Sequence, residues 1–210
     1  MKRNFFLFFY LGLIITSAAQ NGFTLVKDET LVRQKFAEIP KKITSIKASF
    51  VQEKNLSALS DKLISKGFFY FEKDNKVRLE YTSPFKYLMV MNNGKMLIKD
   101  DAKTSKVDLR SNKIFQSVNR IMTDCVNGTA LTNPDFSTKV FESSTQYKLE
   151  MTPIGKGMKD FFKVIYIFIE KKDYSASRLE LHEKSADNTI ITFQNKELNK
   201  PLVATLFAVK

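Results

Sequence analysis

Residues 44–100 read TSIKASFVQEKNLSALSDKLISKGFFYFEKDNKVRLEYTSPFKYLMVMNNGKMLIKD, and this stretch decides the fold. From Ile46 to Phe50, apolar residues alternate with others at the period of two that is expected of a half-buried β-strand. Turn residues then separate each strand from the next, at Asp74-Asn75, Ser83-Pro84 and Asn92-Asn93-Gly94. Such short connections join antiparallel strands, so the stretch predicts consecutive hairpins. It is rich in Phe, Tyr and Met, which favours a protein that binds an apolar partner.

The same alternation returns in the second half of the chain. Five further strands are predicted, at residues 140–143, 147–151, 161–170, 176–183 and 189–197. A last apolar segment, residues 202–209, follows Pro201 and also has the composition of a strand, and the sequence leaves open whether it pairs with the sheet or closes over its edge. The sequence therefore predicts a mainly β protein with about eleven strands.

Two amphipathic helices interrupt this pattern. The first is predicted over Asp28–Lys42, with Asp28 as its N-cap. Its apolar stripe consists of Leu31, Val32, Phe36 and Ile39. The second is predicted over Asn112–Val126, where Asn127-Gly128 supplies a C-cap signal. Its apolar stripe consists of Phe115, Val118, Ile121 and Met122.

A helix between two groups of strands needs a surface to cover, and the concave face of a single sheet provides one. We therefore expect one curved antiparallel sheet that forms an open half β-barrel covered by helices. Such a face can enclose a hydrophobic pocket, or the helix can fill it completely. Periodicity leaves both alternatives open.

The N-terminus has the pattern of a secretory signal peptide. Lys2 and Arg3 precede the apolar run Phe5–Ile15, and Ser17-Ala18-Ala19 offers a cleavage site near Ala19. The apolar run is shorter than the roughly 18 residues needed to span a bilayer. We expect residues 1–19 to be removed and residues 20–210 to form one domain in the periplasm. Cleavage lowers the formal net charge from +12 to +10, because it removes two basic residues.

The composition argues against catalysis and against a metal site. The chain has no GxSxG, HExxH or Cys-x-x-Cys motif, and it has a single histidine, His182. Cys125 is the only cysteine, so no internal disulfide can form, and its apolar neighbours favour a buried, inert thiol. We expect neither enzyme activity nor a cofactor. Because the lysines are scattered and the chain is exported, its basic charge favours a membrane or protein partner over nucleic acid.

The first half of the chain resembles the LolA family of outer-membrane lipoprotein carriers. The resemblance rests on Ala48–Lys54, Gly67–Phe71, Val77–Tyr81, Pro84 and the Asn93-Gly94 turn. At residue level it covers about Ile46 to Asp100, and in the order of the elements it covers nearly the whole mature chain. It implies a periplasmic chaperone that sequesters the acyl chains of lipoproteins. Such a carrier takes them from an inner-membrane ABC-type exporter to the outer membrane, where an acceptor is possible, and we expect it to be a monomer.

The resemblance also assigns roles to residues of this chain. The predicted lining of the lipid pocket consists of Phe50, Phe69, Phe71, Val77, Leu79, Tyr81 and Met89. Val77 and Leu79 fall on apolar positions of the family, and strand alternation adds Tyr81. Both faces of the preceding strand are apolar, and Phe69 and Phe71 are chosen because they share the face of Lys73, while Met89 fits the lining and an ordinary core.

The predicted lid consists of Phe115, Val118, Ile121 and Met122. The basic residue that latches sheet to lid falls on Lys73, while the family's following proline is replaced by Asp74. An alternative is an envelope lipid-binding module or scaffold of the same fold that carries no lipoprotein.

Overall fold

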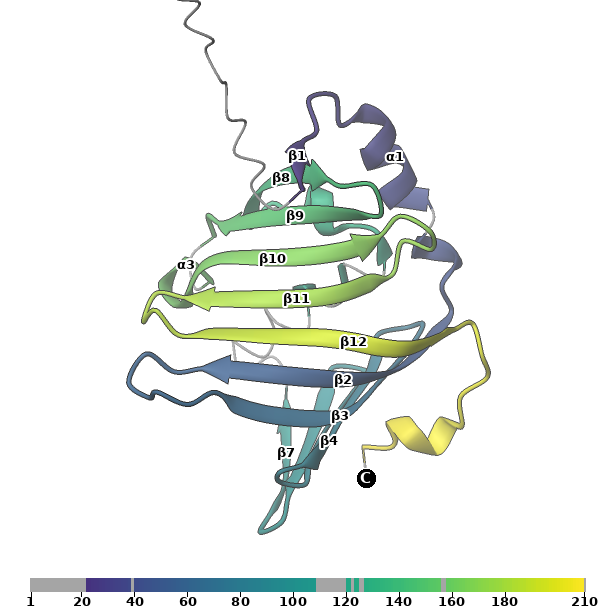
Figure 1. Cartoon of the computed structure of the whole chain (residues 1–210). Coiled ribbons are helices and arrows are strands. Elements are labelled where there is room, and N and C mark those ends of the chain that lie inside the picture. The colour runs from purple at the N-terminus through teal and green to yellow at the C-terminus, as the bar shows by residue number, and fades with distance from the viewer. Residues whose placement is uncertain are drawn as a thin grey trace, which may run out of the picture.

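The computed structural model describes residues 22–38, 40–108, 120–121, 123–124, 127–155 and 158–209. Within these residues, twelve strands pair side by side in one antiparallel sheet, which curves into an open half-barrel (Figure 1). The predicted fold class is confirmed. In sheet order the strands are β1 (Thr24–Leu25), β8 (Phe136–Glu142), β9 (Gln146–Pro153), β10 (Phe162–Glu170), β11 (Ala176–Glu183), β12 (Asn188–Leu198), β2 (Ser45–Asn55), β3 (Leu63–Glu72), β4 (Lys76–Ser83), β5 (Tyr87–Asn92), β6 (Lys95–Asp100) and β7 (Thr104–Asp108).

Two runs of hairpins make up the sheet, and a single strand pair joins them. Strands β2 to β7 pair in chain order, and so do β8 to β12. At the β5–β6 turn, Asn93 and Gly94 have φ values of +49° and +74°, which fits the two-residue type I′ turn that Asn-Gly favours. Strand β12 then pairs with β2 and places Phe193 opposite Phe50, although most of the chain separates them.

Cross-strand pairing aligns the inner-face residues in rows. One row consists of Phe193, Phe50, Gly67, Tyr81 and Tyr87. Gly67 is required here for steric reasons: a Cβ atom would lie 2.1 Å from the Glu80 carbonyl oxygen and 2.8 Å from Cζ of Phe50. The missing side chain therefore lets β4 and the Phe50 ring approach β3 closely.

Helix α1 (Thr30–Glu38) is shorter than the predicted helix over Asp28–Lys42. Its cap is the predicted one, because the Asp28 carboxylate accepts a hydrogen bond of 3.0 Å from the Thr30 backbone N–H. A short 3-10 turn, η1 (Pro40–Lys42), follows it.

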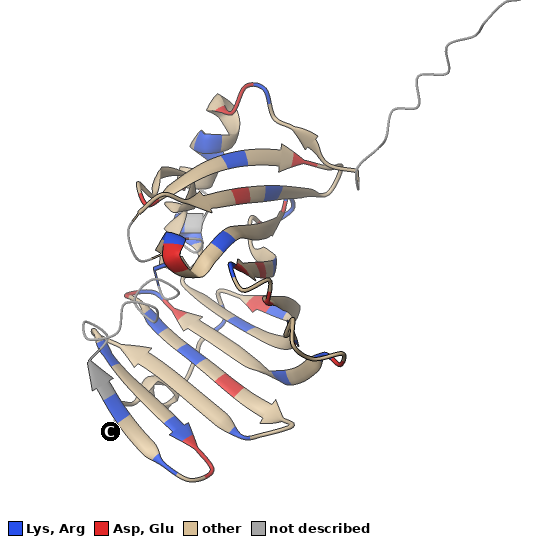
Figure 2. Ribbon diagram, turned by 90° about the vertical axis from the view of Figure 1, so that its left-hand side faces the viewer, with Lys and Arg blue, Asp and Glu red and all other residues tan. Residues whose placement is uncertain are grey.

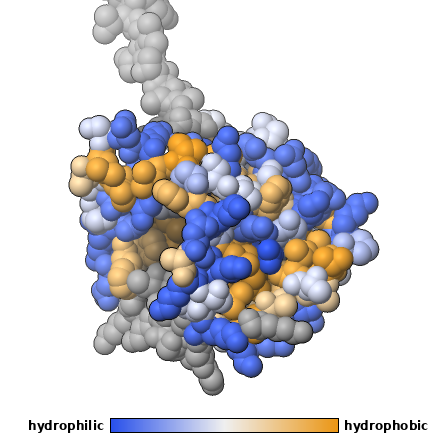
Figure 3. Space-filling model, turned by 90° about the horizontal axis from the view of Figure 1, so that it is seen from below, coloured by the Kyte–Doolittle hydropathy of each residue, from blue (hydrophilic) through white to orange (hydrophobic). Residues whose placement is uncertain are grey.

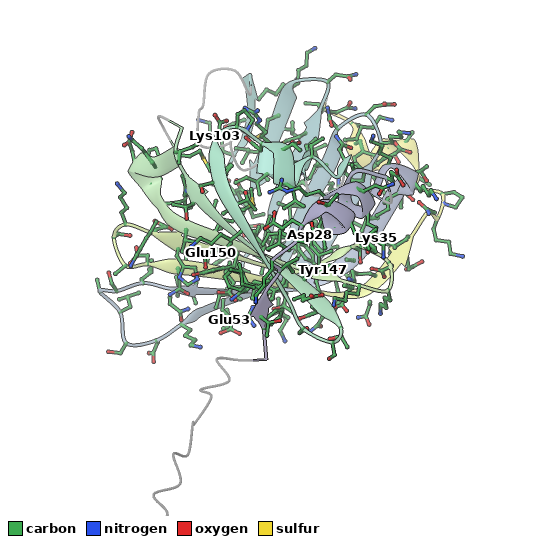
Figure 4. All side chains as sticks on the ribbon, turned by 90° about the horizontal axis from the view of Figure 1, so that it is seen from above. Asp28, Lys35, Glu53, Lys103, Tyr147 and Glu150 are labelled. Atoms are coloured by element: carbon green, nitrogen blue, oxygen red, sulfur yellow. The ribbon has the colours of Figure 1, made fainter. Side chains whose placement is uncertain are left out.

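Helix α1 lies across the upper end of the curved sheet (Figure 4). Val32 and Phe36 are buried, and the Phe36 ring packs edge-on against the rings of Tyr147 and Tyr174. Leu31 was expected in the same stripe but is 59% exposed, because the helix buries only one narrow face. The helix therefore closes one end of the half-barrel.

The second predicted helix is present where the structure describes it, since residues 120–121, 123–124 and 127 are helical. Gly128 follows the last helical residue with a φ of +74°. The Thr129 backbone N–H donates to the Asp124 carbonyl oxygen at 2.9 Å, as at a helix C-terminus capped by a left-handed residue. Ile121 is buried at 3% exposure. The predicted lid residues Phe115, Val118 and Met122, like Cys125, lie outside the described residues. Two more short helical segments are η3 (Ala130–Thr132) and α3 (Met158–Phe161).

The predicted C-terminal strand over residues 202–209 is wrong. The segment forms a 3-10 helix, η4 (Ala204–Phe207), with extended flanks, and it packs on the outer face of the sheet. Phe207 is 1% exposed and contacts the buried outer-face residues Val90 and Leu97. The segment has apolar residues at consecutive positions, so the alternation pattern could not distinguish a strand from a short helical segment that covers the sheet.

Arg78 and Glu80 lie on the outer face of β4, but the side chain of Arg78 is largely shielded from solvent there. The Arg78 side chain is 17% exposed and forms an ion pair of 2.8 Å with Glu80. Its Nη1 also donates to the Leu206 carbonyl oxygen at 3.1 Å. The C-terminal segment thus covers this part of the outer face and takes the guanidinium out of water.

Candidate functional site

The inner face of the half-barrel carries two buried apolar clusters. One lies on β2 to β6 and the other lies on β8 to β11, where it receives α1 and Ile121. The β2–β6 cluster consists of Ile43, Ile46, Phe50, Phe69, Phe71, Val77, Leu79, Met89, Met91 and Met96. The β8–β11 cluster consists of Val32, Phe36, Ile121, Ala130, Leu131, Phe136, Val140, Tyr147, Leu149, Met151, Met158, Phe162, Ile165, Ile167, Ile169, Tyr174 and Leu179.

An apolar pocket, which we call the seam pocket, lies between these clusters where β12 meets β2. It holds about 640 Å³ of space when the part open to solvent is included. The centre of a water molecule fits into only about 50 Å³ of it, so the pocket is a narrow slot. Its lining consists of Ile43, Ile46, Ala48, Phe69, Ile121, Ile167, Tyr174, Ser175, Ala176, Leu179, Phe193 and Lys196. A narrow, mostly apolar slot suits an extended hydrocarbon chain.

A β-bulge in β12 shapes one wall of the seam pocket. The pairing with β2 slips between Gln194 and Glu197, and Asn195 has a φ of +51°, a left-handed conformation that Asn tolerates. Phe193 and Leu198 both pack against the β2–β6 cluster, although strict alternation would place residues five positions apart on opposite faces. The bulge therefore shifts the alternation by one residue and brings the side chain of Lys196 into the pocket wall.

Ala48 keeps the pocket open on the β2 side. It pairs with Phe69 on β3, and on its other side it faces the bulged residues of β12, between the pairs that Lys47 and Ser49 form. It is 1% exposed and ends in a methyl group. A larger side chain at this position would occupy the space between Phe69 and Lys196.

Lys196 is the one lysine among the residues that line the seam pocket. Its Nζ donates to the Ser175 hydroxyl oxygen at 2.6 Å and to the Ala176 carbonyl oxygen at 3.3 Å. Burial lowers the pKa of this amine, and the carboxylates of Asp173 and Glu170 act in the opposite direction. The pocket thus combines an apolar slot with one partly desolvated cation.

A second hollow lies near the other end of β3 to β5, lined by Ser65, Tyr81, Pro84, Phe85 and Tyr87, with about 540 Å³ of space including open solvent. The Tyr81 hydroxyl donates to Gln52 Oε1 at 2.9 Å, and burial raises the pKa of Tyr81 to about 12. Phe85 is 74% exposed at its rim. Seen from below, the molecule shows several apolar areas among polar side chains (Figure 3).

A family model described as outer membrane lipoprotein carrier protein LolA matches residues 41–210. The chain belongs to the LolA family. The resemblance seen in the sequence is therefore confirmed. No curated protein sequence matches the chain.

Solved structures similar to this LolA family member have very low sequence identity to it. An uncharacterized conserved protein from Thermus thermophilus is 10% identical with a TM-score of 0.51, covering 87% of this chain and 95% of the other. A LolA superfamily protein from Nitrosomonas europaea is 10% identical with a TM-score of 0.45, covering 85% and 96%. The lipoprotein LppX from Mycobacterium tuberculosis is 12% identical with a TM-score of 0.47, covering 82% and 96%.

The lining residues that the LolA resemblance suggested all lie on the inner face. Of these seven residues only Phe69 lines the seam pocket, and Ile121 from the predicted lid joins it. Tyr81 lines the second hollow. The other five are packed within the β2–β6 cluster, each at 7% exposure or less: Phe50, Phe71, Val77, Leu79 and Met89. Their role in lipid binding stays a prediction.

Sequence reasoning missed the contribution of β10 to β12 to the pocket. Ile167, Leu179, Phe193 and Lys196 come from strands that were predicted correctly but were given no functional role. The one local signal was Asn195, since an Asn inside an otherwise alternating strand is compatible with a bulge.

Lys73, the predicted latch, is exposed in the turn between β3 and β4. Its backbone N–H donates to the Thr44 carbonyl oxygen at 2.9 Å. Among the described residues its side chain forms no hydrogen bond or ion pair, so the latch stays a prediction. The neighbouring Asp74 has a φ of +70°, which the ring of the family's proline excludes. The replacement of the family's proline by Asp74 therefore goes together with a turn conformation that proline cannot adopt.

Charged side chains are distributed widely over the part of the chain that the structure describes (Figure 2). Lys and Arg are spread over strands of both halves of the sheet (Figure 2). Among the described residues, no three His, Cys, Asp or Glu side chains are grouped so that they could hold a metal ion. In the same part of the chain, no helix has the length and apolar character to cross a membrane.

Proposed function

We propose that this protein is a lipoprotein carrier of the bacterial envelope that binds the acyl chains of lipid-modified proteins on the inner face of its half-barrel. The observation that carries the proposal is the seam pocket, a narrow apolar slot between two filled clusters. Membership of the LolA family supports it, because the description of that family names lipoprotein carriers.

The proposed activity is binding and release, without bond making or breaking. Most large side chains of the inner face are packed, so the free space is small. In this proposal, movement of α1 or of the helix around Ile121 enlarges the slot when a second or third acyl chain enters. Helix α1 contacts the β8–β11 cluster through its buried residues Val32 and Phe36, so it can separate from the sheet at a low cost.

The proposed route follows from the character of the cargo. An acyl chain that leaves a membrane must stay covered until it reaches another, so the carrier works in the aqueous periplasm between the inner-membrane exporter and the outer membrane. Export requires the signal peptide predicted over residues 1–19, which lie outside the described part of the chain. Cargo moves toward the partner that binds it better, and so no energy source in the carrier is needed.

Native mass spectrometry of the protein purified from the periplasm of its own cells tests this proposal first. We expect a fraction of the molecules to carry the added mass of an acylated protein or of an acyl lipid. A purified protein that is always empty and bound to another protein would contradict the carrier function and favour the scaffold alternative.

A release assay tests the lipoprotein itself. Spheroplasts that retain newly made lipoproteins are incubated with the purified mature protein, and the supernatant is probed for lipoproteins in complex with it. We expect lipoproteins in the supernatant only when the protein is present. Albumin, which binds free fatty acids, serves as the control for non-specific extraction. Equal release by both proteins would argue against a dedicated carrier.

A further inference from the structure

Lys196 has a position that acyl-chain binding alone does not require. It stands on a bulge that turns its side chain from the outer to the inner face, and it lines an otherwise apolar pocket. The neighbouring strand residues Lys47 and Glu197 form an ion pair with each other, at 3.0 Å. Unlike Lys47, Lys196 forms no ion pair with a described residue.

The amine of Lys196 is only partly compensated by the protein. Two of its three N–H groups have acceptors, the Ser175 hydroxyl and the Ala176 carbonyl oxygen. The carboxylate of Asp173 is engaged by the backbone N–H and the hydroxyl of Ser175, at 2.9 and 2.6 Å, so it reaches the amine only through that hydroxyl. Glu170 accepts a hydrogen bond of 2.9 Å from Gln146 instead.

A partly desolvated cation without a direct counter-ion lowers stability unless another charge neutralises it. The lowered pKa of Lys196 has this cause, since desolvation is its largest contribution. An anion in the pocket would take the third N–H of Nζ and favour the protonated form of the amine. The apolar wall formed by Ala48, Phe69 and Phe193 would at the same time cover a hydrocarbon chain attached to that anion.

We propose that the seam pocket takes an acyl ligand that carries an anionic group, which Lys196 Nζ binds beside Ser175. The chemistry shared by the candidate ligands is an oxyanion at the end of a hydrocarbon chain, either the carboxylate of a free fatty acid or the phosphate of a lipid headgroup. This inference rests on the proposed acyl-chain binding and goes beyond it, because the amide- and ester-linked acyl chains of a lipoprotein carry no free anion. The bound molecule enters with its chain along the seam and its anion at the bulge.

The test compares ligands that share a chain but differ in the head. Palmitate, palmitoyl lysophosphatidic acid and neutral palmityl alcohol each displace a fluorescent acyl probe from the mature protein, and their affinities are compared. A charge-assisted hydrogen bond in a desolvated site predicts that at least one anionic ligand binds roughly tenfold or more tightly than the alcohol. Preference for the carboxylate alone indicates a free fatty acid, and preference for the phosphate indicates a lipid headgroup.

Variants separate the charge from the packing of the side chain. Lys196→Gln keeps a donor for Ser175 but removes the charge, so it should bind all three ligands with similar affinity. Lys196→Arg should keep the anion preference. Lys163→Gln, on an exposed position of β10, is the matched control and should bind like the parent.

Equal affinity of the parent for the alcohol and both anions would overturn the inference while leaving acyl-chain binding intact. A preference that survives in Lys196→Gln would also overturn it, because the charge would then come from elsewhere. Failure of the parent to bind the probe and all three ligands would instead overturn the proposed function. If Lys196→Gln does not fold, judged by circular dichroism, the parent's selectivity and that of Lys196→Arg decide.

Discussion

Replacing Ala48 by Leu should fill the seam pocket from the β2 side and weaken acyl-chain binding. The change adds three carbon atoms where Ala48 now faces the bulge. If they displace three methylene groups of a bound chain, at about 0.8 kcal/mol for each buried methylene, binding loses about 2.4 kcal/mol. That loss corresponds to a dissociation constant roughly 50-fold higher. Ala48→Val adds two carbons and should lose about 1.6 kcal/mol, roughly 15-fold.

Titration of a fluorescent acyl probe measures both changes, and urea denaturation shows whether the variants are folded. Because the slot is narrow, we expect each variant to lose at most about 3 kcal/mol of its free energy of unfolding, which is the upper end of the range for adding methylene groups to a packed interior. Val51→Leu is the control, since Val51 lies on the same strand, is only partly buried and does not line the pocket. It should bind the probe like the parent.

The result that would refute this reasoning is a folded Ala48→Leu variant with the affinity of the parent. The acyl chain would then lie elsewhere on the inner face, and the second hollow at Tyr81 and Phe85 would be the next candidate.

Three further predictions concern the frame around the pocket. Gly67→Ala should lower the free energy of unfolding by at least about 2 kcal/mol, because the added Cβ atom would lie 2.1 Å from the Glu80 carbonyl oxygen. An unchanged urea midpoint would contradict this close approach of the two strands. Arg78→Ala should lower the free energy of unfolding by about 1.5–3 kcal/mol and speed up hydrogen exchange in the C-terminal segment, since it removes the charged donor to the Leu206 carbonyl oxygen. Exchange as slow as in the parent would count against that contact. Tyr81 has its pKa raised from 10.0 to about 12, so between these pH values the unfolded chain loses a proton that the folded chain keeps, and stability falls as pH rises. Tyr81→Phe should reduce this loss of stability at alkaline pH by up to about 2.7 kcal/mol, measured by urea denaturation below pH 10 and above pH 12. The same loss of stability in the variant and the parent would mean that other groups cause it.

The sheet could be predicted from the sequence because its information is local. Alternation and turn residues determine which side chains share a face, and the structure places Phe69 and Phe71 inward while Phe68 is 40% exposed. Strand β1 escaped prediction because two residues carry no period. The segment 202–209 was misassigned because an apolar run without alternation fits a strand and a cover equally well.

The pocket could not be predicted because it depends on how closely the two runs of hairpins approach each other. Alternation showed that Leu79 faces inward, but not that its neighbours bury it to 6% exposure. The inward position of Lys196 could not be predicted for a different reason. In strict alternation with Phe193 its side chain would face outward, and only the bulge at Asn195 reverses this. A register shift depends on pairing with a strand distant in sequence, which a single segment does not specify.

The β12–β2 pairing also determines the order of events when the chain folds. Each run of hairpins can pair locally, but the seam between them closes only after β12, near the end of the chain, has found β2 near its beginning. Such distant pairing carries the largest loop-closure entropy in the sheet and is expected to be slow. We therefore expect the seam pocket to form late in folding, so that a chain with only half its hairpins in place binds no acyl probe and probe binding reports on complete folding.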